Sequence, residues 1–262
     1  EIEYGKACLN FLIRKAPGMV DWTPPNKKVA IITVDYPYSS LGAEKFAEAA
    51  KDFGYEVVVN ETIPFGMAEY GPILSKIESS EPAFITYWHV TPDDPARFMK
   101  QFNDYFSDDG YKGMVWMQYA PSIPEFTELA GKDAEGVMYV SGAMGTTKKS
   151  RAYIRQWEKR YGSKPSGFYA SFTRDGLDIW INAVKRAGCA DCYEEVNHQI
   201  RQHSHVGMDP YLFVFDPHNQ SVIYGDGLFA LPMIQIQKGV HQAIWPDQFK
   251  QGNLQLQPWM KK

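Results

Sequence analysis

The chain has 262 residues, of which 44% are hydrophobic and 22% charged, and its formal net charge is -4. This composition is typical of one large or two small globular domains and argues against a disordered chain. Because basic residues are not in excess, neither a nucleic-acid backbone nor an anionic lipid surface is expected as a partner. The apolar runs, such as 29–34 and 84–88, are much shorter than the roughly 20 residues of a membrane-spanning helix, so no such span is expected.

The first 26 residues show no clear structural unit of their own. The chain opens at Glu1 without an initiator methionine or a signal-like apolar segment, which indicates a processed chain or a fragment. Pro17-Gly18 and Pro24-Pro25 act as breakers of regular structure.

From residue 27 to about 165 the sequence alternates short β-branched runs with longer amphipathic stretches. This alternation predicts parallel strands joined by right-handed crossover helices, and therefore a three-layer α/β/α fold with a parallel sheet. We expect strands at 29–34, 56–59, 83–88, 113–117 and 136–140. We expect helices at 41–53, 67–77, 95–105 and 122–130. Asp94 is predicted to cap the third of these helices, and Ser122 with Glu125 has capping-box spacing at the fourth.

After residue 150 the pattern changes to helices followed by short strands. The sequence predicts helices at 151–161, 166–187 and 193–202, and strands at 211–215, 222–225, 230–237 and 240–245. These pieces are expected to belong to a second lobe or to crossovers between lobes, and their strands are too few to complete a second parallel sheet unaided.

Residues that follow the predicted strands are the first candidates for a functional site. Ligands of open parallel sheets bind beyond the carboxyl ends of the strands. These positions are aromatic or polar and hardly charged: Tyr36, Tyr38, Ser39 and Ser40, then Trp88 and His89, then Gln118 and Tyr119. Such a lining suits a small molecule held by ring packing and hydrogen bonds. The alternative is that the rings only cover the top of the core.

Several kinds of chemistry have no motif in this sequence. Dinucleotide and nucleotide fingerprints are missing, so no cofactor is expected. Of the six histidines only His203 and His205 lie close together in the sequence, which favours a polar loop over a metal site. No catalytic triad or nucleophile elbow can be recognised, so we do not expect an enzyme.

Cys189 and Cys192 have C-x-x-C spacing, but a helix precedes them rather than a strand, which disfavours a thioredoxin-like site. The pair is predicted either to form a loop disulfide in an oxidising compartment or to remain two reduced thiols.

Residues 27–42 and 49–57 resemble the second lobe of type I periplasmic binding proteins, the branched-chain amino acid and amide receptors of ABC transporters. The resemblance continues in order along most of the chain, at 63–77, 133–138, 157–161, 244–246 and Trp259. It implies two α/β lobes with a hinge, a solute bound in the cleft between them, and an ABC permease as partner. It also implies a monomer in the periplasm or another extracytoplasmic location, secreted and with a lipid anchor in the precursor as one option.

The resemblance places ligand contacts by motif position. Tyr38, Ser39 and Ser40 match the first-strand contacts, Trp88 and His89 the third, and Gln118 and Tyr119 the fourth; Phe172 and Arg174 occupy the crossover-helix motif. Arg174 replaces the usual Tyr and Ser40 the usual Gly, and no acid stands at 118 or 119 to receive an ammonium group. These departures disfavour a standard α-amino acid, and Arg174 either pairs a carboxylate or sits on the surface.

The resemblance also predicts how the chain is divided. Residues 1–26 are expected to be a crossover or remnant of an incomplete lobe one, and 27–165 a complete lobe two. Residues 166–238 are expected to belong to lobe one and the crossovers, and 239–262 to return to lobe two or the hinge.

The predicted function is capture of a small organic solute (an amino acid, an amide or an aromatic carboxylate) and its delivery to a permease. The alternatives are a ligand-sensing regulator or receptor ectodomain of the same fold and, less favoured, a flavodoxin-like or hydrolytic α/β enzyme.

Overall fold

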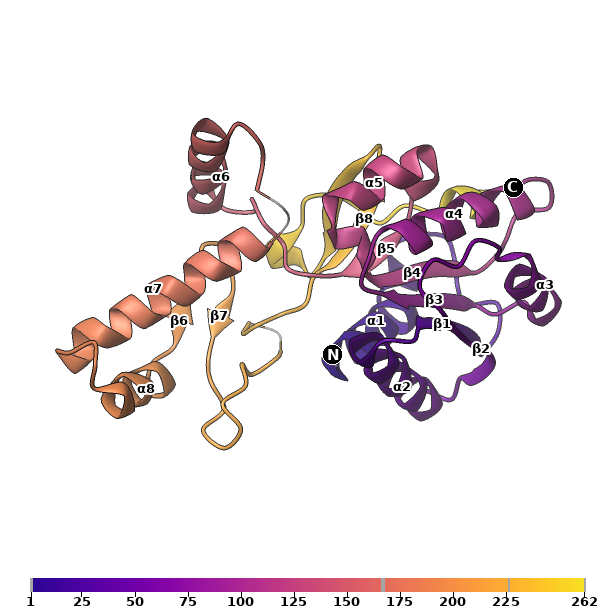
Figure 1. Cartoon of the computed structure of the whole chain (residues 1–262). Coiled ribbons are helices and arrows are strands. Elements are labelled where there is room, and N and C mark those ends of the chain that lie inside the picture. The colour runs from indigo at the N-terminus through magenta and orange to yellow at the C-terminus, as the bar shows by residue number, and fades with distance from the viewer. Residues whose placement is uncertain (1, 166–167, 226, 262) are drawn as a thin grey trace. The chain divides into compact units, whose positions relative to one another are not determined.

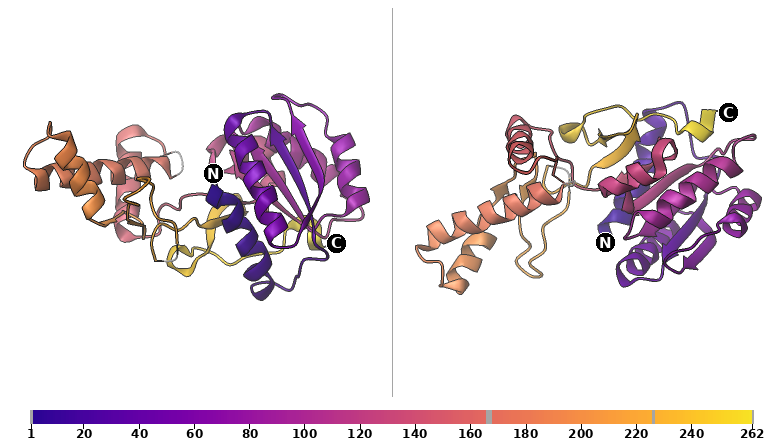
Figure 2. Two further views of the ribbon diagram at one scale, coloured as in Figure 1. Left: turned by 90° about the horizontal axis from the view of Figure 1, so that it is seen from below. Right: turned by 45° about the horizontal axis from the view of Figure 1, so that its top comes forward.

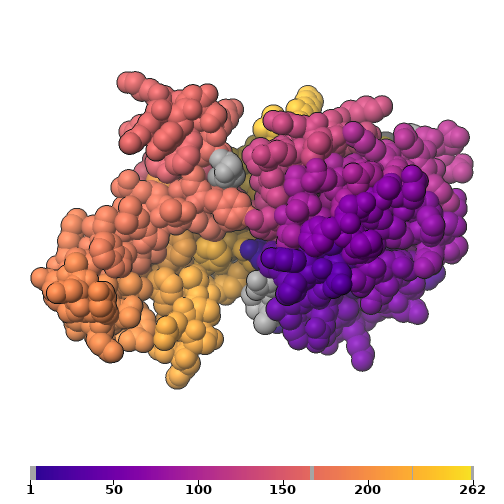
Figure 3. Space-filling model, viewed as in Figure 1, coloured from indigo at the N-terminus to yellow at the C-terminus, as the bar shows by residue number. Residues whose placement is uncertain are grey.

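The computed structural model describes residues 2–165, 168–225 and 227–261, which form two compact units. Unit 1 contains the chain up to Ser141, then Met233–Ile244 and the segment from Gln251 onward. Unit 2 is formed by Gly142–Pro232 and Trp245–Lys250. The chain thus leaves unit 1 after Ser141, earlier than the boundary expected near residue 165. Figure 3 shows the surface by residue number, with the first part of unit 1 in indigo to magenta.

Unit 1 is built on a seven-stranded sheet of order β2-β1-β3-β4-β5-β8-β9. The first five strands are parallel, which confirms the predicted fold class, and β8 pairs antiparallel with β5. The strands are β1 Lys28–Val34, β2 Glu56–Ile63, β3 Phe84–His89, β4 Met114–Tyr119, β5 Met138–Val140, β8 Met233–Gln237 and β9 Val240–Trp245. The run expected at 230–237 therefore contributes a strand to this sheet instead of to the other lobe.

Helices cover both faces of the sheet, as right-handed crossovers require (Figure 1). Helix α2, Pro37–Asp52, connects β1 to β2, which lies at one edge of the sheet. The chain then crosses the sheet in the opposite direction, from β2 through β3 and β4 to β5. The helices of these later connections cover the other face: α3 (Gly71–Ser80), α4 (Asp93–Tyr105) and α5 (Pro124–Ala130). Short 3-10 turns occupy Ala16–Gly18, Ala120–Ser122, Gly131–Ala134, Asp247–Phe249 and Pro258–Lys261.

The N-terminal segment forms a helix that was not expected from the sequence. Helix α1, Ile2–Arg14, lies beside α2, as Figure 2 shows. Its buried side chains, Ala7, Cys8, Leu9, Phe11 and Leu12, have helical spacing. Residues 1–26 were expected to be a remnant of another lobe, but the helix is part of unit 1 and completes the layer on the α2 face.

Two predicted helix caps are wrong. Helix α4 begins at Asp93, so Asp94 lies inside the first turn, and its carboxylate instead accepts a hydrogen bond from the Gly66 N–H at 2.7 Å. Ser122 does not cap α5: its hydroxyl donates to the Tyr119 carbonyl at 2.7 Å. Both side chains bond to loops at the carboxyl edge of the sheet instead of to the helix start. Capping rules consider only the residues next to the helix start, so they do not predict these contacts.

Unit 2 is mostly helical. It contains α6 Lys148–Tyr161, α7 Tyr169–Ala187, α8 Tyr193–Gln202 and the two-stranded pair β6 His205–Val206 with β7 Leu212–Phe213. Ser166, where α7 was expected to begin, lies outside the described residues. The Thr147 side chain caps α6 by accepting from the Ser150 N–H at 3.0 Å. The strand expected at 222–225 is reduced to isolated bridges, Phe215 to Val222 and Tyr224 to Phe229.

A glutamine side chain joins β4 to β5. The two strands share one register pair, Trp116 with Met138. Next to it, the fully buried Gln257 accepts from the Val115 N–H at 2.8 Å and donates to the carbonyls of Val115 and Gly136 at 2.7 and 2.8 Å. The amide therefore supplies the hydrogen bonds that a longer β5 would have made.

Candidate functional site

The register of the sheet brings three predicted loops to one edge. Trp88 pairs with Gln118, and His89 with Tyr119, so β3 and β4 end side by side. The loop after β1 joins them, because the Tyr38 and Tyr119 rings lie edge to face with centroids 5.8 Å apart. The Gln118 amide also reaches the Tyr38 hydroxyl at 3.4 Å. The predicted residues of unit 1 thus form one cluster at the carboxyl edge.

Burial divides this cluster into two layers. Ser40 is exposed, and Tyr38 and Tyr119 are half-buried, so these three can touch a bound molecule directly. Four members are 0–2% exposed and form a layer below: Ser39, Trp88, His89 and Gln118. In the lower layer, Ser39 Oγ, Trp88 Nε1 and Gln118 Oε1 have no hydrogen-bond partner among the described residues, and His89 Nε2 has only an ion-pair contact with Asp94.

Trp88 belongs to the core beneath the edge. Its ring lies 5.0 Å from that of Trp116 and 6.2 Å from that of Phe46. Helix α2 can approach this close because it carries Gly42 here: a Cβ at Gly42 would lie 2.5 Å from Trp88 Cε3. Trp88 therefore supports the edge from below rather than presenting its own surface.

His89 is held in a network of hydrogen bonds and charges. Its Nε2 lies 3.2 Å from the Asp94 carboxylate, and its Nδ1 accepts from the Thr91 N–H at 3.1 Å. Asp94 also pairs with Arg97 at 2.9 Å. Burial lowers the pKa of His89, although the nearby Asp94 charge opposes that shift. The network fixes the start of α4 to the loop around Gly66, so His89 has a positioning role in this structure.

Tyr119 has an unusual backbone conformation. Its φ and ψ are 71° and -59°, which is the strained γ-turn region for a residue other than glycine. The Ser122 hydroxyl, bonded to the Tyr119 carbonyl, supports this turn. Such strain persists where the surroundings impose it, and it often occurs at binding sites. Here it accompanies the contact of the Tyr119 ring with Tyr38.

The loop after β2 contributes an aromatic residue, Phe65, that was not among the site residues predicted from the sequence. Phe65 is 48% exposed, and its ring lies 6.1 Å from that of Tyr36, which is 44% exposed. On its other side Phe65 meets the His89 ring at 5.2 Å. The signal was present in the sequence, because Phe65 follows β2 just as Tyr36 follows β1.

The two predicted residues of unit 2 are engaged within that unit. Phe172 packs against the rings of Tyr211 at 5.0 Å and Phe229 at 5.6 Å. Arg174 forms an ion pair with Asp178 at 3.0 Å, one turn further along α7. Hydrogen bonding to Asp178 is the main cause of its raised pKa. Their role as ligand contacts stays a prediction.

Beside Arg174, the side chain of Asp175 is buried and accepts a hydrogen bond from the Met208 N–H at 2.9 Å. Burial raises the pKa of Asp175 to about 6. Further along, Cys189 and Cys192 are joined by a disulfide at the turn between α7 and α8.

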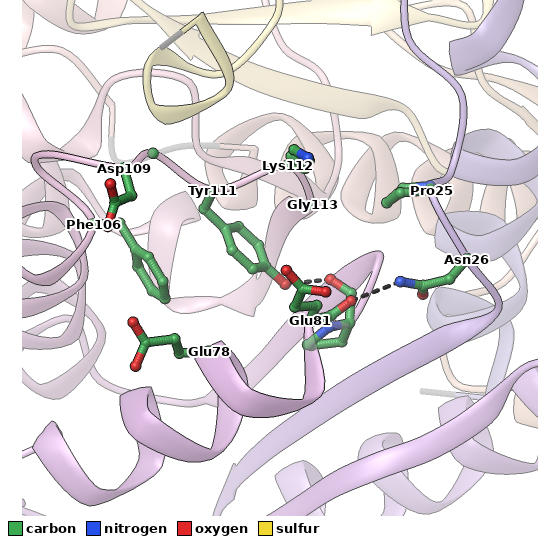
Figure 4. A pocket seen from close by; sticks show the side chains of 11 residues that line it. Pro25, Asn26, Glu78, Glu81, Phe106, Asp109, Tyr111, Lys112 and Gly113 are labelled. Carbon is green, nitrogen blue, oxygen red and sulfur yellow. Dashed lines mark hydrogen bonds between the residues drawn. The ribbon is translucent and has the colours of Figure 1, made fainter.

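A cavity of about 400 Å³ lies at the opposite edge of the sheet, where β3 and β4 begin (Figure 4). Its wall includes Asn26, whose amide donates to the Glu81 carbonyl at 2.7 Å, and Tyr111, whose hydroxyl donates to the Pro82 carbonyl. Carboxylates of Glu78, Glu81 and Asp109 lie around it. Because ligands of parallel sheets bind at the carboxyl ends of the strands, we do not assign the solute site to this cavity.

Within the part of the chain that the structure describes, no group of three or more His, Cys, Asp or Glu side chains is placed to hold a metal ion. The described helices also include none with the length and apolar character to cross a membrane.

Solved structures similar to this chain include proteins described as ABC transporter, leucine-binding and solute-binding proteins. A branched-chain amino acid ABC transporter protein from Silicibacter pomeroyi is 25% identical, with a TM-score of 0.83 over 99% of this chain and 68% of its own. The leucine-binding protein LivK from Thermotoga maritima is 18% identical, with a TM-score of 0.71 over 92% of this chain and 64% of its own. A solute-binding protein from R. palustris in complex with benzoate is 18% identical, with a TM-score of 0.68 over 92% of this chain and 61% of its own.

The chain thus spans roughly two thirds of the length of these structures. A search of curated proteins found no match. A family model described as periplasmic binding protein matches residues 13–220, well over half of the chain. The resemblance noted in the sequence is confirmed: this chain belongs to the periplasmic binding protein family.

Proposed function

We propose that this chain is the extracytoplasmic substrate-binding protein of an ABC transporter, that it captures a small organic solute, and that it delivers the solute to a membrane permease. The observation that carries the proposal is the two-layered cluster at the carboxyl edge of the unit 1 sheet, in a chain of the periplasmic binding protein family. In this proposal Tyr38, Ser40 and Tyr119 contact the solute.

The buried layer serves these contacts in the proposal. Ser39 and Gln118 offer hydrogen bonds from below, and Trp88 and His89 keep the loops in place. Rings with a few directed polar groups are the usual lining of a small-molecule site. The chain acts as a non-enzymatic, monomeric receptor here.

Similar proteins support this choice of solute classes: one is described as a branched-chain amino acid transporter protein, one as a leucine-binding protein and one as a complex with benzoate. We propose a solute among amino acids, amides and aromatic carboxylates.

Isothermal titration of the complete protein against a library of these three classes tests the proposal. We expect one class to bind with a Kd in the micromolar range or below, and to raise Tm with the logarithm of its concentration once that concentration exceeds Kd. Absence of heat and of a thermal shift with every class, in a sample shown to be folded by circular dichroism, would refute solute binding. Delivery is tested separately, by reconstituting the permease encoded with this chain and measuring solute-stimulated ATP hydrolysis.

A further inference from the structure

We infer, resting on the proposed function, that the solute is an aromatic carboxylate whose ring packs on Tyr36 and Phe65 and whose carboxylate is bound at the first turn of α2. Two observations carry this inference independently: the exposed pair of rings, and buried polar atoms without a partner beside an uncapped helix start.

The first observation is the ring pair, Tyr36 and Phe65. The two rings meet edge to face at 79°, and about half of each ring residue remains exposed. Phe65 is supported from behind by the buried His89 ring, which Asp94 holds in place. Exposed rings that are fixed in this way offer a ready surface for another planar ring, because little side-chain freedom is lost on binding.

The second observation is the start of α2. The helix has 16 residues, its first turn contains no acidic residue, and no described side chain caps it. Its N–H groups and dipole therefore favour an anion there. Ser39, in this turn, is fully buried with a hydroxyl that has no partner in the described structure, and the next residue, Ser40, is exposed.

Gln118 adds a third polar group below the same turn. Its Nε2 reaches the Tyr38 hydroxyl, while its Oε1 has no partner among the described residues. The two amide atoms can exchange places by a flip of the side chain, and in either orientation one of them is left to bind a ligand. A buried polar group of this kind is costly unless something bonds to it.

The charges around this edge favour a carboxylate over an ammonium group. The buried Asp94 is already used by the Gly66 N–H and by Arg97. Arg97 in turn donates to the Met67 carbonyl, so it is not placed as a counter-ion. Asp35 and Asp93 are not buried, and water screens their charges. At this edge of unit 1, therefore, an ammonium group would meet no buried and unengaged acid among the described residues, whereas a carboxylate finds hydroxyl and N–H donors.

Four solutes separate the parts of this inference in titrations with the complete protein: benzoate, cyclohexanecarboxylate, benzyl alcohol and L-leucine. We expect benzoate to bind best. Loss of the flat ring in cyclohexanecarboxylate, or of the charge in benzyl alcohol, should each weaken binding about tenfold, the size expected for one ring contact or one charged hydrogen bond.

Tighter binding of leucine than of benzoate overturns the inference and leaves the proposed function standing. Equal binding of benzoate and cyclohexanecarboxylate also overturns it. If neither these four solutes nor any member of the library gives binding heat or a shift in Tm, the proposed function is refuted as well.

Variants locate the site. Phe65→Leu should weaken benzoate about tenfold and change cyclohexanecarboxylate less than threefold. Ser40→Ala should weaken both acids to a similar degree. Tyr193→Leu removes a ring that is 74% exposed in unit 2 and should change neither Kd. If Phe65→Leu, folded by circular dichroism, behaves like Tyr193→Leu, the ring contact is refuted.

Discussion

The same substitution, glycine to alanine, should have opposite effects at two helical positions of this chain. In the middle of a helix, alanine is favoured over glycine by about 0.5–1 kcal/mol, because glycine loses more backbone freedom on folding. Gly176 in α7 has nothing within 4 Å of its would-be Cβ. Gly176→Ala should therefore stabilise the protein by about that amount.

Gly42 in α2 differs because its would-be Cβ lies 2.5 Å from both Cε3 and Cζ3 of Trp88. Trp88 is fully buried and held between Phe46 and Trp116, so it has little room to move. Overpacking of this kind costs about 1–3 kcal/mol, which exceeds the gain in helix propensity. We expect Gly42→Ala to destabilise the protein by about 1–2 kcal/mol net.

Urea unfolding followed by circular dichroism measures both effects. The midpoint should rise for Gly176→Ala and fall for Gly42→Ala. Trp88→Phe leaves a space in the core and is itself destabilising, so Gly42→Ala should cost less in the Trp88→Phe background than in the parent chain. If Gly42→Ala raises the midpoint as Gly176→Ala does, the close approach of α2 to the sheet is wrong.

Three further predictions concern buried polar groups. Burial lowers the pKa of His89 below the ordinary value of 6.5, so the unfolded chain binds this proton more readily and His89 makes the protein less stable as the pH falls below about 6.5. His205, His241 and Asp175 also have shifted pKa values, but they titrate in both proteins, so the unfolding midpoint of His89→Gln should rise relative to that of the parent chain as the pH falls from 7 to 5; a constant difference would contradict the assignment. Asp94→Ala removes the acceptor of the Gly66 N–H and the partner of Arg97, whose side chain is 41% exposed and so stays hydrated; it should destabilise the fold by about 1–3 kcal/mol in thermal unfolding, and an effect below about 0.5 kcal/mol would show that the network is dispensable. Gln257→Leu removes the amide that bonds to the N–H and carbonyl of Val115 and one of the two donors to the Gly136 carbonyl, and it should cost about 2–4 kcal/mol. The exposed Gln202→Leu should stay within about 0.5 kcal/mol; equal effects in urea unfolding would refute the role of the amide.

The parallel sheet was predictable because buried strands and amphipathic helices leave strong periodic patterns. Helix α1 has such a pattern too, but the helix-breaking pair Pro17-Gly18 just after it favoured an irregular segment for residues 1–26. The position of β8 was not predictable, because pairing between residues about a hundred apart leaves no local signal.

The candidate site was predictable at the level of strand ends and unpredictable at the level of side-chain direction. A residue at a strand end can face the solvent, as Tyr119 partly does, or the core, as Trp88 does. The difference depends on which face a helix covers and on Gly42, which lies far from Trp88 in sequence. Arg174 shows the same limit, since its partner Asp178 is on its own helix.

The way the chain returns to unit 1 has a consequence for folding kinetics. Residues 142–232 are inserted between β5 and β8, and Gln257 bonds to Val115 across 142 positions of sequence. Contacts of such large separation form slowly, because a long loop has to close before they can contribute. The first four strands can pair early. The edge of β5 that pairs with β8 should remain unpaired until residues 142–232 have folded, or have formed a loop that lets β8 reach β5. Substitutions that slow the folding of unit 2 are therefore expected to prolong the time during which unit 1 exposes an unpaired strand edge. In that state a chain of this topology is most prone to aggregate.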